Sequence, residues 1–363
     1  MTPFIDELAP WIDQHLKGLP ATAKVTPAPC AEPQNPSFSM LDYAQQRIIR
    51  QTESLPKSFG SKETWEKYRG QVAAWLRKTC DLDSVQSGEA MHVSRAVRDG
   101  MVLETVLLPQ DKNFDVPVLL VYRDKKDAGN RPAVIFSCDG GQSILDDDVV
   151  KLAVSLAKDG FVVCVPDHPN VNPRSRRSMG SLVSFYGCSD SVGLSPVAMR
   201  VRDDMSVFGY LGQRVGIDVN RIAMVGLGFG GVDGAIFAAV EPGIAALGVT
   251  GAITVRDWAD KVAANENEFN YWVPYLHEMT LQTDLQYVYS SIAPRPLLLV
   301  DGTYRKLWPE SGYRRVGEMA DRIFGLYNKP EALAKQPAKS DWGIEEIGQW
   351  LGTTLKSDQP ATN

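Results

Sequence analysis

The sequence predicts a doubly wound α/β fold with a mostly parallel sheet and an N-terminal helical extension. Three observations support this prediction. From Met101 onward, strand-like runs alternate with helix-like segments, and most of these runs are continuously apolar, as in strands covered on both faces. The first hundred residues instead show helical spacing of apolar residues around a Pro-rich stretch. The chain has 363 residues, of which 44% are hydrophobic, so it can bury a large core.

The N-terminal segment, residues 1–100, is expected to be a helical arm packed on the main domain. Apolar spacing predicts helices at residues 4–19, 39–51 and 61–78, and Ser61 is a suitable N-cap for the last. The intervening Pro- and Ala-rich stretch, residues 20–36, predicts a linker or surface arm.

The main domain is expected to span residues 101–357, followed by a flexible tail at 358–363. It opens with a predicted hairpin whose strands are residues 101–108 and 116–122. Strands and helices then alternate. The predicted strands are residues 132–137, 161–166, 221–227, 244–253, 296–300 and 332–336, and the helices are 147–158, 196–214, 230–240, 311–326 and 344–355.

The most informative segment is residues 221–231, where a predicted strand runs into a Gly-rich turn and then a helix. Gly226, Gly228 and Gly230 fit the frame Gly-x-Ser-x-Gly, in which a strained turn lifts a serine nucleophile above the sheet. Position 228 is Gly, so the hydroxyl is missing. Glycine also adopts the strained conformation of such a turn freely.

Three further landmarks accompany this turn. Residues 203–218 followed by Arg221-Ile-Ala precede it, and residues 292–302 form a later strand segment, Ile-Ala-Pro-Arg-Pro-Leu-Leu-Leu-Val-Asp-Gly. Residues 132–141 end in Asp139-Gly-Gly. From about Met101 to Leu355 the chain resembles the acetyl-xylan-esterase and dienelactone-hydrolase-like group of the α/β-hydrolase superfamily, whose members carry His-Gly where this chain has Asp139-Gly140. The resemblance implies that fold, a Ser-Asp-His triad and an oxyanion loop at residues 139–141.

The triad positions depart from that pattern. The resemblance places Arg305 where the family has its acid and Lys339 where it has its histidine. The four histidines are His15, His92, His168 and His277, so none lies between residues 278 and 363. A single Ser-to-Gly change could be a laboratory substitution in an active enzyme, but three changed positions favour a degenerate triad.

The oxyanion site is expected to keep its backbone donors. The resemblance implies that the N–H of Phe229 faces the former oxyanion position and that Gly140 and Gly141 supply the second set, beside the space left at Gly228. Asp139 is either a turn residue or a carboxylate able to act as a base.

Charged and aromatic residues give further alternatives for this pocket. Arg305 and Lys339 either favour an anionic ligand, form solvated loop charges, or pair with Asp139 and plug the site. His168 and His277 are alternative acid/base candidates or structural histidines. Trp308 and Phe229 are candidates to fill the pocket, and an aromatic group is expected either to stack on substrate or to pack as a lid, namely Phe269, Tyr271, Trp272 and Tyr275.

Three functions fit these residues. The first is a pseudo-hydrolase that binds a small, anionic or sugar-derived ligand, or a partner protein, without chemistry. The second is a non-canonical lyase, hydratase, decarboxylase or isomerase that uses the oxyanion site with Asp139, Arg305 and Lys339. The third is a water-based esterase that works through Asp139 or one of the histidines. All three follow from the missing acyl-transfer triad.

Composition excludes other classes. The net charge of −6 and the interspersed charges argue against nucleic-acid binding, and no apolar run reaches the length of a membrane span. The 5 Cys lack metal-type spacing, so we expect no metal site. We also expect no cofactor, and a small-molecule ligand as the partner. The N-terminus lacks a signal peptide, which favours a cytoplasmic protein, or an exported one if a leader was removed. No pattern in the sequence indicates the oligomeric state.

Overall fold

The computed structural model describes residues 40–85, 89–111, 114–124, 130–139, 142–169, 189, 191–263, 276–302 and 309–355. The chain divides into two compact units, Met1–Tyr43 and Ala44–Asn363. Only the first turn of helix α2 (Met40–Ser54) belongs to the described part of the first unit. The description below concerns the second unit.

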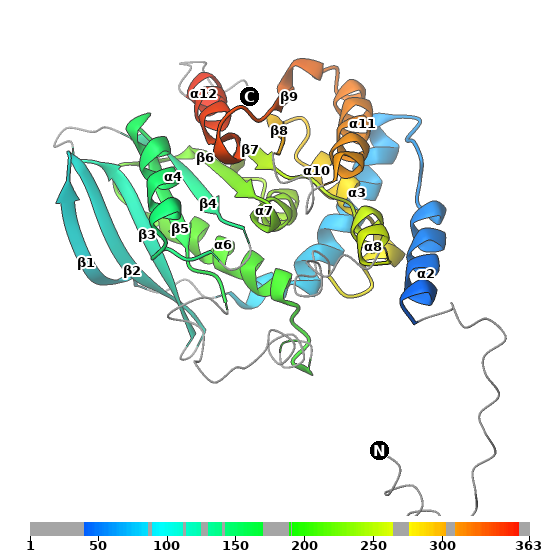
Figure 1. The fold of residues 1–363 in the computed structure, drawn as a ribbon, viewed down its shortest axis with the longest axis horizontal. Helices are drawn as coiled ribbons and strands as arrows, with labels where there is room; N and C mark the ends of the chain where they lie inside the picture. Colours follow the sequence, from blue (N-terminus) through cyan, green and yellow to red (C-terminus); the bar gives the residue numbers. More distant parts are fainter. Residues whose placement is uncertain are drawn as a thin grey trace, which may run out of the picture. The chain divides into compact units, whose positions relative to one another are not determined.

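The second unit is built on a nine-stranded sheet with the order β1-β2-β3-β5-β4-β6-β7-β8-β9 (Figure 1). Strands β4 to β9 run parallel, and the first three strands pair antiparallel at one edge. This confirms the predicted doubly wound, mostly parallel sheet. The strands are β1 (Met91–Arg98), β2 (Met101–Asp111), β3 (Phe114–Arg123), β4 (Arg131–Ser137), β5 (Val162–Pro166), β6 (Ile217–Leu227), β7 (Ile244–Thr250), β8 (Leu297–Asp301) and β9 (Leu333–Pro337).

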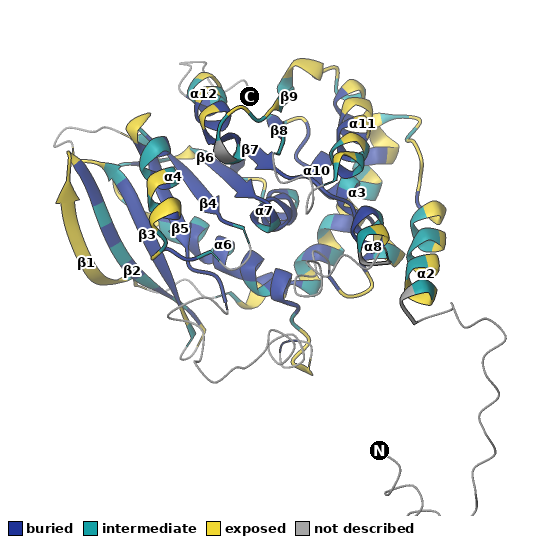
Figure 2. Ribbon diagram, viewed as in Figure 1, coloured by how far each residue is buried: buried dark blue, intermediate teal, exposed yellow. Residues whose placement is uncertain are grey.

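Strand β1 departs from the sequence prediction, which assigned residues up to 100 to a helical arm. All eight residues of β1 are exposed, so hydrophobic burial leaves little signal in the sequence (Figure 2). Asp99 and Gly100 connect β1 to β2 with φ angles of 50° and 72°. Asp-Gly with positive φ at both positions is the preferred two-residue hairpin turn, and it is the signal that could have located the strand.

Helices cover both faces of the sheet. One face carries α4 (Asp147–Lys158) and α12 (Ile344–Leu355), whose apolar side chains share a buried cluster with Phe136, Val163 and Val225. The other face carries α3, α6, α7, α10 and α11, which share a second cluster with Ile135 and Cys164. These helices, with the shorter α8 and α9, are α3 (Lys62–Thr79), α6 (Pro196–Gln213), α7 (Phe229–Val240), α8 (Val255–Ala263), α9 (Met279–Gln282), α10 (Leu285–Ser290) and α11 (Glu310–Leu326); three 3₁₀ turns span Leu82–Ser84, Pro330–Ala332 and Asp341–Gly343.

Helix α3 joins the N-terminal region to this core. The Ser61 hydroxyl accepts a hydrogen bond from the Thr64 N–H, and the Thr64 hydroxyl accepts one from the Ser61 N–H, which forms a reciprocal cap. Trp65 and Leu76 are fully buried in the same cluster as α7. The predicted N-cap at Ser61 is therefore present, and α3 belongs to the same compact unit as the sheet.

The strand order reverses around β4. From β4 the chain passes through α4 to β5 on one side, and α6 then returns it to β6 on the other side of β4. In open α/β sheets the crevice for ligands lies outside the carboxyl ends of strands at such a reversal. Ser137 and Leu227 end the two strands there, so the predicted site lies at this edge. Among the helices of the described residues, none is long and apolar enough to cross a membrane.

Candidate functional site

The turn between β6 and α7 has the geometry of a nucleophile elbow. Gly228 has φ 57° and ψ −119°, a conformation that is strained for a residue with a side chain. A Cβ atom on Gly226 would lie 2.1 Å from the Gly230 carbonyl oxygen, and one on Gly230 would lie 2.1 Å from the Ser137 carbonyl oxygen. Gly226 and Gly230 therefore allow β6, α7 and β4 to approach one another closely, while Gly228 occupies the central position of the turn.

The first amide of α7 is occupied by a carboxylate. The Phe229 N–H donates to Asp139 Oδ1 at 2.9 Å. Gly228, the N-cap residue, has no side chain with which to cap the helix, so Asp139 supplies the acceptor from the loop after β4. The donor that sequence reasoning expected to face an empty oxyanion position is thus engaged by the protein itself.

A buried serine, histidine and aspartate lie next to the elbow. Ser137 Oγ lies 2.8 Å from His168 Nε2, and His168 Nδ1 lies 3.3 Å from Asp203 Oδ2. Gln110 Nε2 donates to the second oxygen of Asp203 at 3.0 Å. Ser137 and Asp203 are fully buried, and His168 is 2% exposed.

Arg200 of α6 connects this group to the elbow helix. Its Nε donates to Asp233 of α7, one Nη donates to the Cys138 carbonyl at 2.7 Å, and the same nitrogen donates to Ser137 Oγ at 3.3 Å. The Asp203 carboxylate can only accept, so His168 Nδ1–H donates to it, and in the neutral imidazole this tautomer leaves Nε2 to accept the proton of Ser137 Oγ, which itself accepts from Arg200. The nearby carboxylate of Asp233 raises the pKa of Arg200 despite its burial, so Arg200 remains a buried cation.

Asp204 lies in the same interior without a hydrogen-bond partner among the described residues. Burial, reinforced by the negative charge of Asp233, raises the pKa of the Asp204 carboxyl well above its usual value. Asp204 is therefore a buried carboxyl group whose neutral form persists to a higher pH than that of an exposed aspartate.

The solved structures that resemble this chain include several esterases. No protein-family model matches the chain. Methylesterase BT1017 is similar with a TM-score of 0.66 and 15% identity, over 87% of this chain and 69% of that chain. Acetyl Xylan Esterase 1 from Thermoanaerobacterium sp. JW/SL YS485 is similar with a TM-score of 0.53 and 16% identity, over 86% of this chain and 98% of that chain. A CE15 glucuronoyl esterase from Teredinibacter turnerae T7901 is similar with a TM-score of 0.58 and 12% identity, over 97% of this chain and 99% of that chain.

The chain has an α/β-hydrolase fold. One protein with a similar sequence is also described as a hydrolase. "Putative hydrolase YtaP" of Bacillus subtilis (strain 168) is 24% identical over 239 residues, which cover 62% of this chain and 78% of that protein. The predicted resemblance to acetyl xylan esterases is confirmed at the level of the fold.

Two of the remaining predicted site residues, Lys339 and His277, lie in the described part of the chain. Lys339 follows β9 with an exposed side chain, and its backbone N–H donates to Glu346 Oε1 at 3.2 Å. Trp342 of the same loop packs against the core, and its carbonyl accepts from Thr250 Oγ1 at 2.5 Å. His277 is exposed and precedes α9. Gly140, Gly141, Arg305, Trp308 and the aromatic group at 269–275 lie outside the described residues.

Sequence reasoning missed Ser137, Asp203 and Arg200. Two of these residues follow a detectable pattern, since charged residues inside the apolar face of α6 contradict ordinary amphipathic spacing and indicate a buried polar network. His168 was identified as a candidate after β5, and the structure places it in that network rather than in an open pocket. Among the described residues, no group of His, Cys, Asp or Glu side chains has a metal-binding arrangement.

Proposed function

We propose that this α/β-hydrolase-fold protein binds a carboxylate-bearing, sugar-derived ligand at its elbow and forms no acyl-enzyme there. The observation that carries the proposal is the 2.9 Å hydrogen bond from the Phe229 N–H to Asp139. In a serine hydrolase the corresponding donor stabilises the oxyanion of the reacting ester. Here it holds the carboxylate of Asp139, which supports a carboxylate as the group that a ligand would place at this helix terminus.

The chemistry of position 228 supports the same proposal. Acyl transfer needs a nucleophilic hydroxyl and a base that removes its proton. Gly228 has no hydroxyl, and the nearby His168 Nε2 is engaged by Ser137. A ligand carboxylate can instead exchange with that of Asp139, because both are acceptors for the same amide.

The names of the structural neighbours suggest which ligands to test first. They include a glucuronoyl esterase, an acetyl xylan esterase and a methylesterase. A uronic acid unites a sugar ring with a carboxylate, so glucuronate is the first probe and glucose its neutral control. We expect glucuronate to raise the melting temperature of the wild-type protein and glucose to leave it unchanged.

The decisive experiment restores the missing hydroxyl. We expect neither the wild-type protein nor Gly228→Ser to hydrolyse p-nitrophenyl acetate or to react with a fluorophosphonate probe, since no histidine lies between residues 278 and 363 and His168 Nε2 is engaged by Ser137. A burst of p-nitrophenol from Gly228→Ser would contradict the proposal by showing that a base lies within reach of that position.

A second candidate function rests on Ser137. The distances of 2.8 Å and 3.3 Å in the Ser137, His168 and Asp203 chain match the order of contacts in a catalytic triad, one strand away from the elbow. Complete burial of Ser137 opposes it, because an ester must reach the hydroxyl. Fluorophosphonate labelling of the wild-type protein that disappears in Ser137→Ala would favour esterase activity at Ser137 over ligand binding alone.

A further inference from the structure

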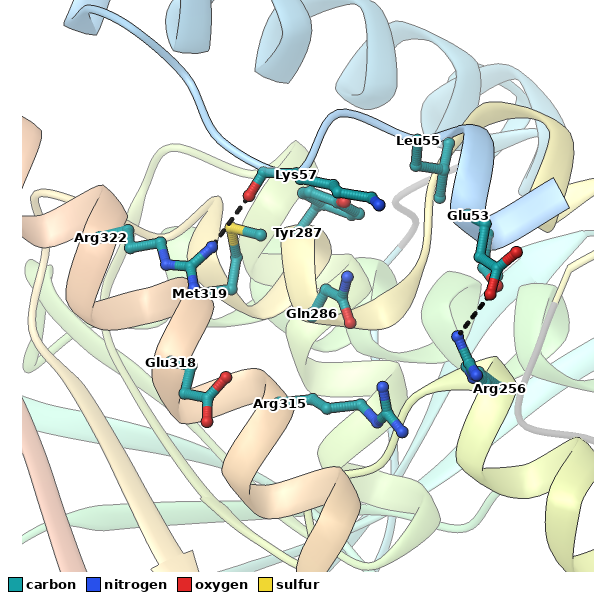
Figure 3. Close-up of a pocket in the computed structure, with 11 residues that line it drawn as sticks. Glu53, Leu55, Lys57, Arg256, Gln286, Tyr287, Arg315, Glu318, Met319 and Arg322 are labelled. Carbon is teal, nitrogen blue, oxygen red and sulfur yellow. Dashed lines mark hydrogen bonds and ion pairs between the residues drawn. The ribbon is translucent and has the colours of Figure 1, made fainter. Parts of the chain in front are cut away.

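A basic pocket lies apart from the elbow. It has a volume of about 320 Å³ and is bounded by the C-terminal end of α2 with the following segment, and by α8, α10 and α11 (Figure 3). Four basic side chains and two acidic ones line it: Lys57, Arg256, Arg315, Arg322, Glu53 and Glu318. None of its lining residues belongs to the elbow or to the Ser137 network. An excess of positive charge around a concave surface favours an anion.

Arg315 is held in position by a buried carboxylate. Its Nε lies 3.2 Å from Asp257 Oδ1, and Asp257 is 3% exposed. Asp257 is itself fixed, because Ser311 Oγ donates to Oδ1 at 2.7 Å and Thr254 Oγ1 donates to Oδ2 at 2.5 Å. With Nε engaged, the terminal nitrogens of the guanidinium extend toward Arg256 and Gln286 (Figure 3). An arginine oriented in this way is prepared for an oxyanion.

The other cations are only partly neutralised. Arg256 Nη1 lies 3.6 Å from Glu53 Oε1, and its buried Nε has no hydrogen-bond partner among the described residues. Lys57 has no ion-pair partner within the same part of the chain. Arg322 instead donates to the Lys57 carbonyl at 2.9 Å and thereby anchors the segment that presents the lysine.

We propose that this pocket binds the phosphate group of a small phosphate monoester. Lys57 lies in the segment after α2, whereas Arg256 and Arg315 belong to α8 and α11. A tetrahedral dianion presents oxygens in several directions at once, whereas a single carboxylate is satisfied by one arginine fork. The pocket exceeds the size of a phosphate ion, and Tyr287 and Met319 provide an apolar wall for the organic part of the ligand.

The test compares ligands at constant ionic strength by calorimetric titration and thermal shift. The probes are glucose 6-phosphate, inorganic phosphate, succinate and glucose. We expect glucose 6-phosphate to bind, inorganic phosphate to bind more weakly, and glucose and succinate not to bind. Arg315→Gln is expected to weaken glucose 6-phosphate binding by about tenfold or more, since it removes charge-assisted hydrogen bonds.

Arg314→Gln is the matched control. It removes the same charge from the neighbouring position of α11, where the side chain is exposed and does not line the pocket. Unchanged affinity in this variant supports the proposal. Equal weakening in both variants, or binding of succinate without binding of the phosphates, would overturn it. Because the two sites share no residues, the glucuronate response of Arg315→Gln should equal that of the wild type, which separates this test from that of the elbow.

Discussion

Position 228 decides the chemistry of the elbow. Its backbone angles, φ 57° and ψ −119°, are those at which a side chain is strained, and active hydrolases accept that strain because the serine is needed there. With glycine the turn keeps its shape without strain. The elbow therefore keeps its backbone conformation without a serine, and the Phe229 amide follows it at the start of α7.

The cost of a side chain at this position can be measured. Gly228→Ala is expected to lower the free energy of unfolding by about 1–3 kcal/mol, because alanine is strained at these angles. Gly212→Ala, at an open and exposed position near the end of α6, is the control and should be neutral or stabilising by up to about 1 kcal/mol. Chemical denaturation measures both. Equal stability of Gly228→Ala and the wild type would show that the turn can change its conformation.

Asp204 makes stability depend on pH. Its pKa is raised in the folded state, so its contribution to stability is fully present below the unfolded value near 3.8 and is lost as the pH rises through the folded value. Asp204→Asn mimics the neutral acid at every pH. The variant should therefore gain stability relative to the wild type as the pH is raised from 4 upward, measured by denaturation at each pH. A difference independent of pH would contradict the assigned shift.

At the scale of elements, Asp139 joins the loop after β4 to helix α7. The helix begins at Phe229 after a residue with no side chain, so its N-terminal amides need an acceptor from elsewhere. Asp139 provides it at 2.9 Å. A carboxylate at this end also interacts favourably with the helix dipole. The same contact stabilises α7 and covers the donor that a ligand would use.

Removing this carboxylate should separate the two roles. Asp139→Ala is expected to lower the free energy of unfolding by about 1 kcal/mol, as for the loss of a helix cap. Acetate or glucuronate should then raise the melting temperature of the variant by more than that of the wild type, because the Phe229 amide is open. Asp139→Asn keeps an acceptor oxygen and should fall between the two. An equal response of all three proteins would place carboxylate binding elsewhere.

At the scale of the whole molecule, Arg200 links β4, α6 and α7 in the interior of the fold. It reaches from α6 to the carboxyl end of β4 and to Asp233 in α7, and all of these groups are buried. An ion pair of this kind is not a large source of stability when compared with apolar residues, but losing one partner leaves a buried charge uncompensated.

Arg200→Met should consequently destabilise the protein by about 3–5 kcal/mol. The double variant Arg200→Met with Asp233→Leu should recover much of that loss, since no buried charge remains unpaired. Urea denaturation of the wild type and the three variants, including Asp233→Leu alone, completes the cycle. Additive losses in the double variant would show that the two side chains do not act as a pair.

The sequence by itself determined the parallel sheet, the frame of the elbow, the missing hydroxyl at Gly228 and the lack of histidine after residue 277. These features depend on local apolar patterns and on residue identity. It did not reveal β1, whose exposed residues carry little burial signal. Only the tertiary structure brought Asp139 to Phe229, 90 positions away, and Ser137 to His168, 31 positions away. Such contacts follow from how strands and helices pack, because no local pattern specifies which distant donor and acceptor will meet.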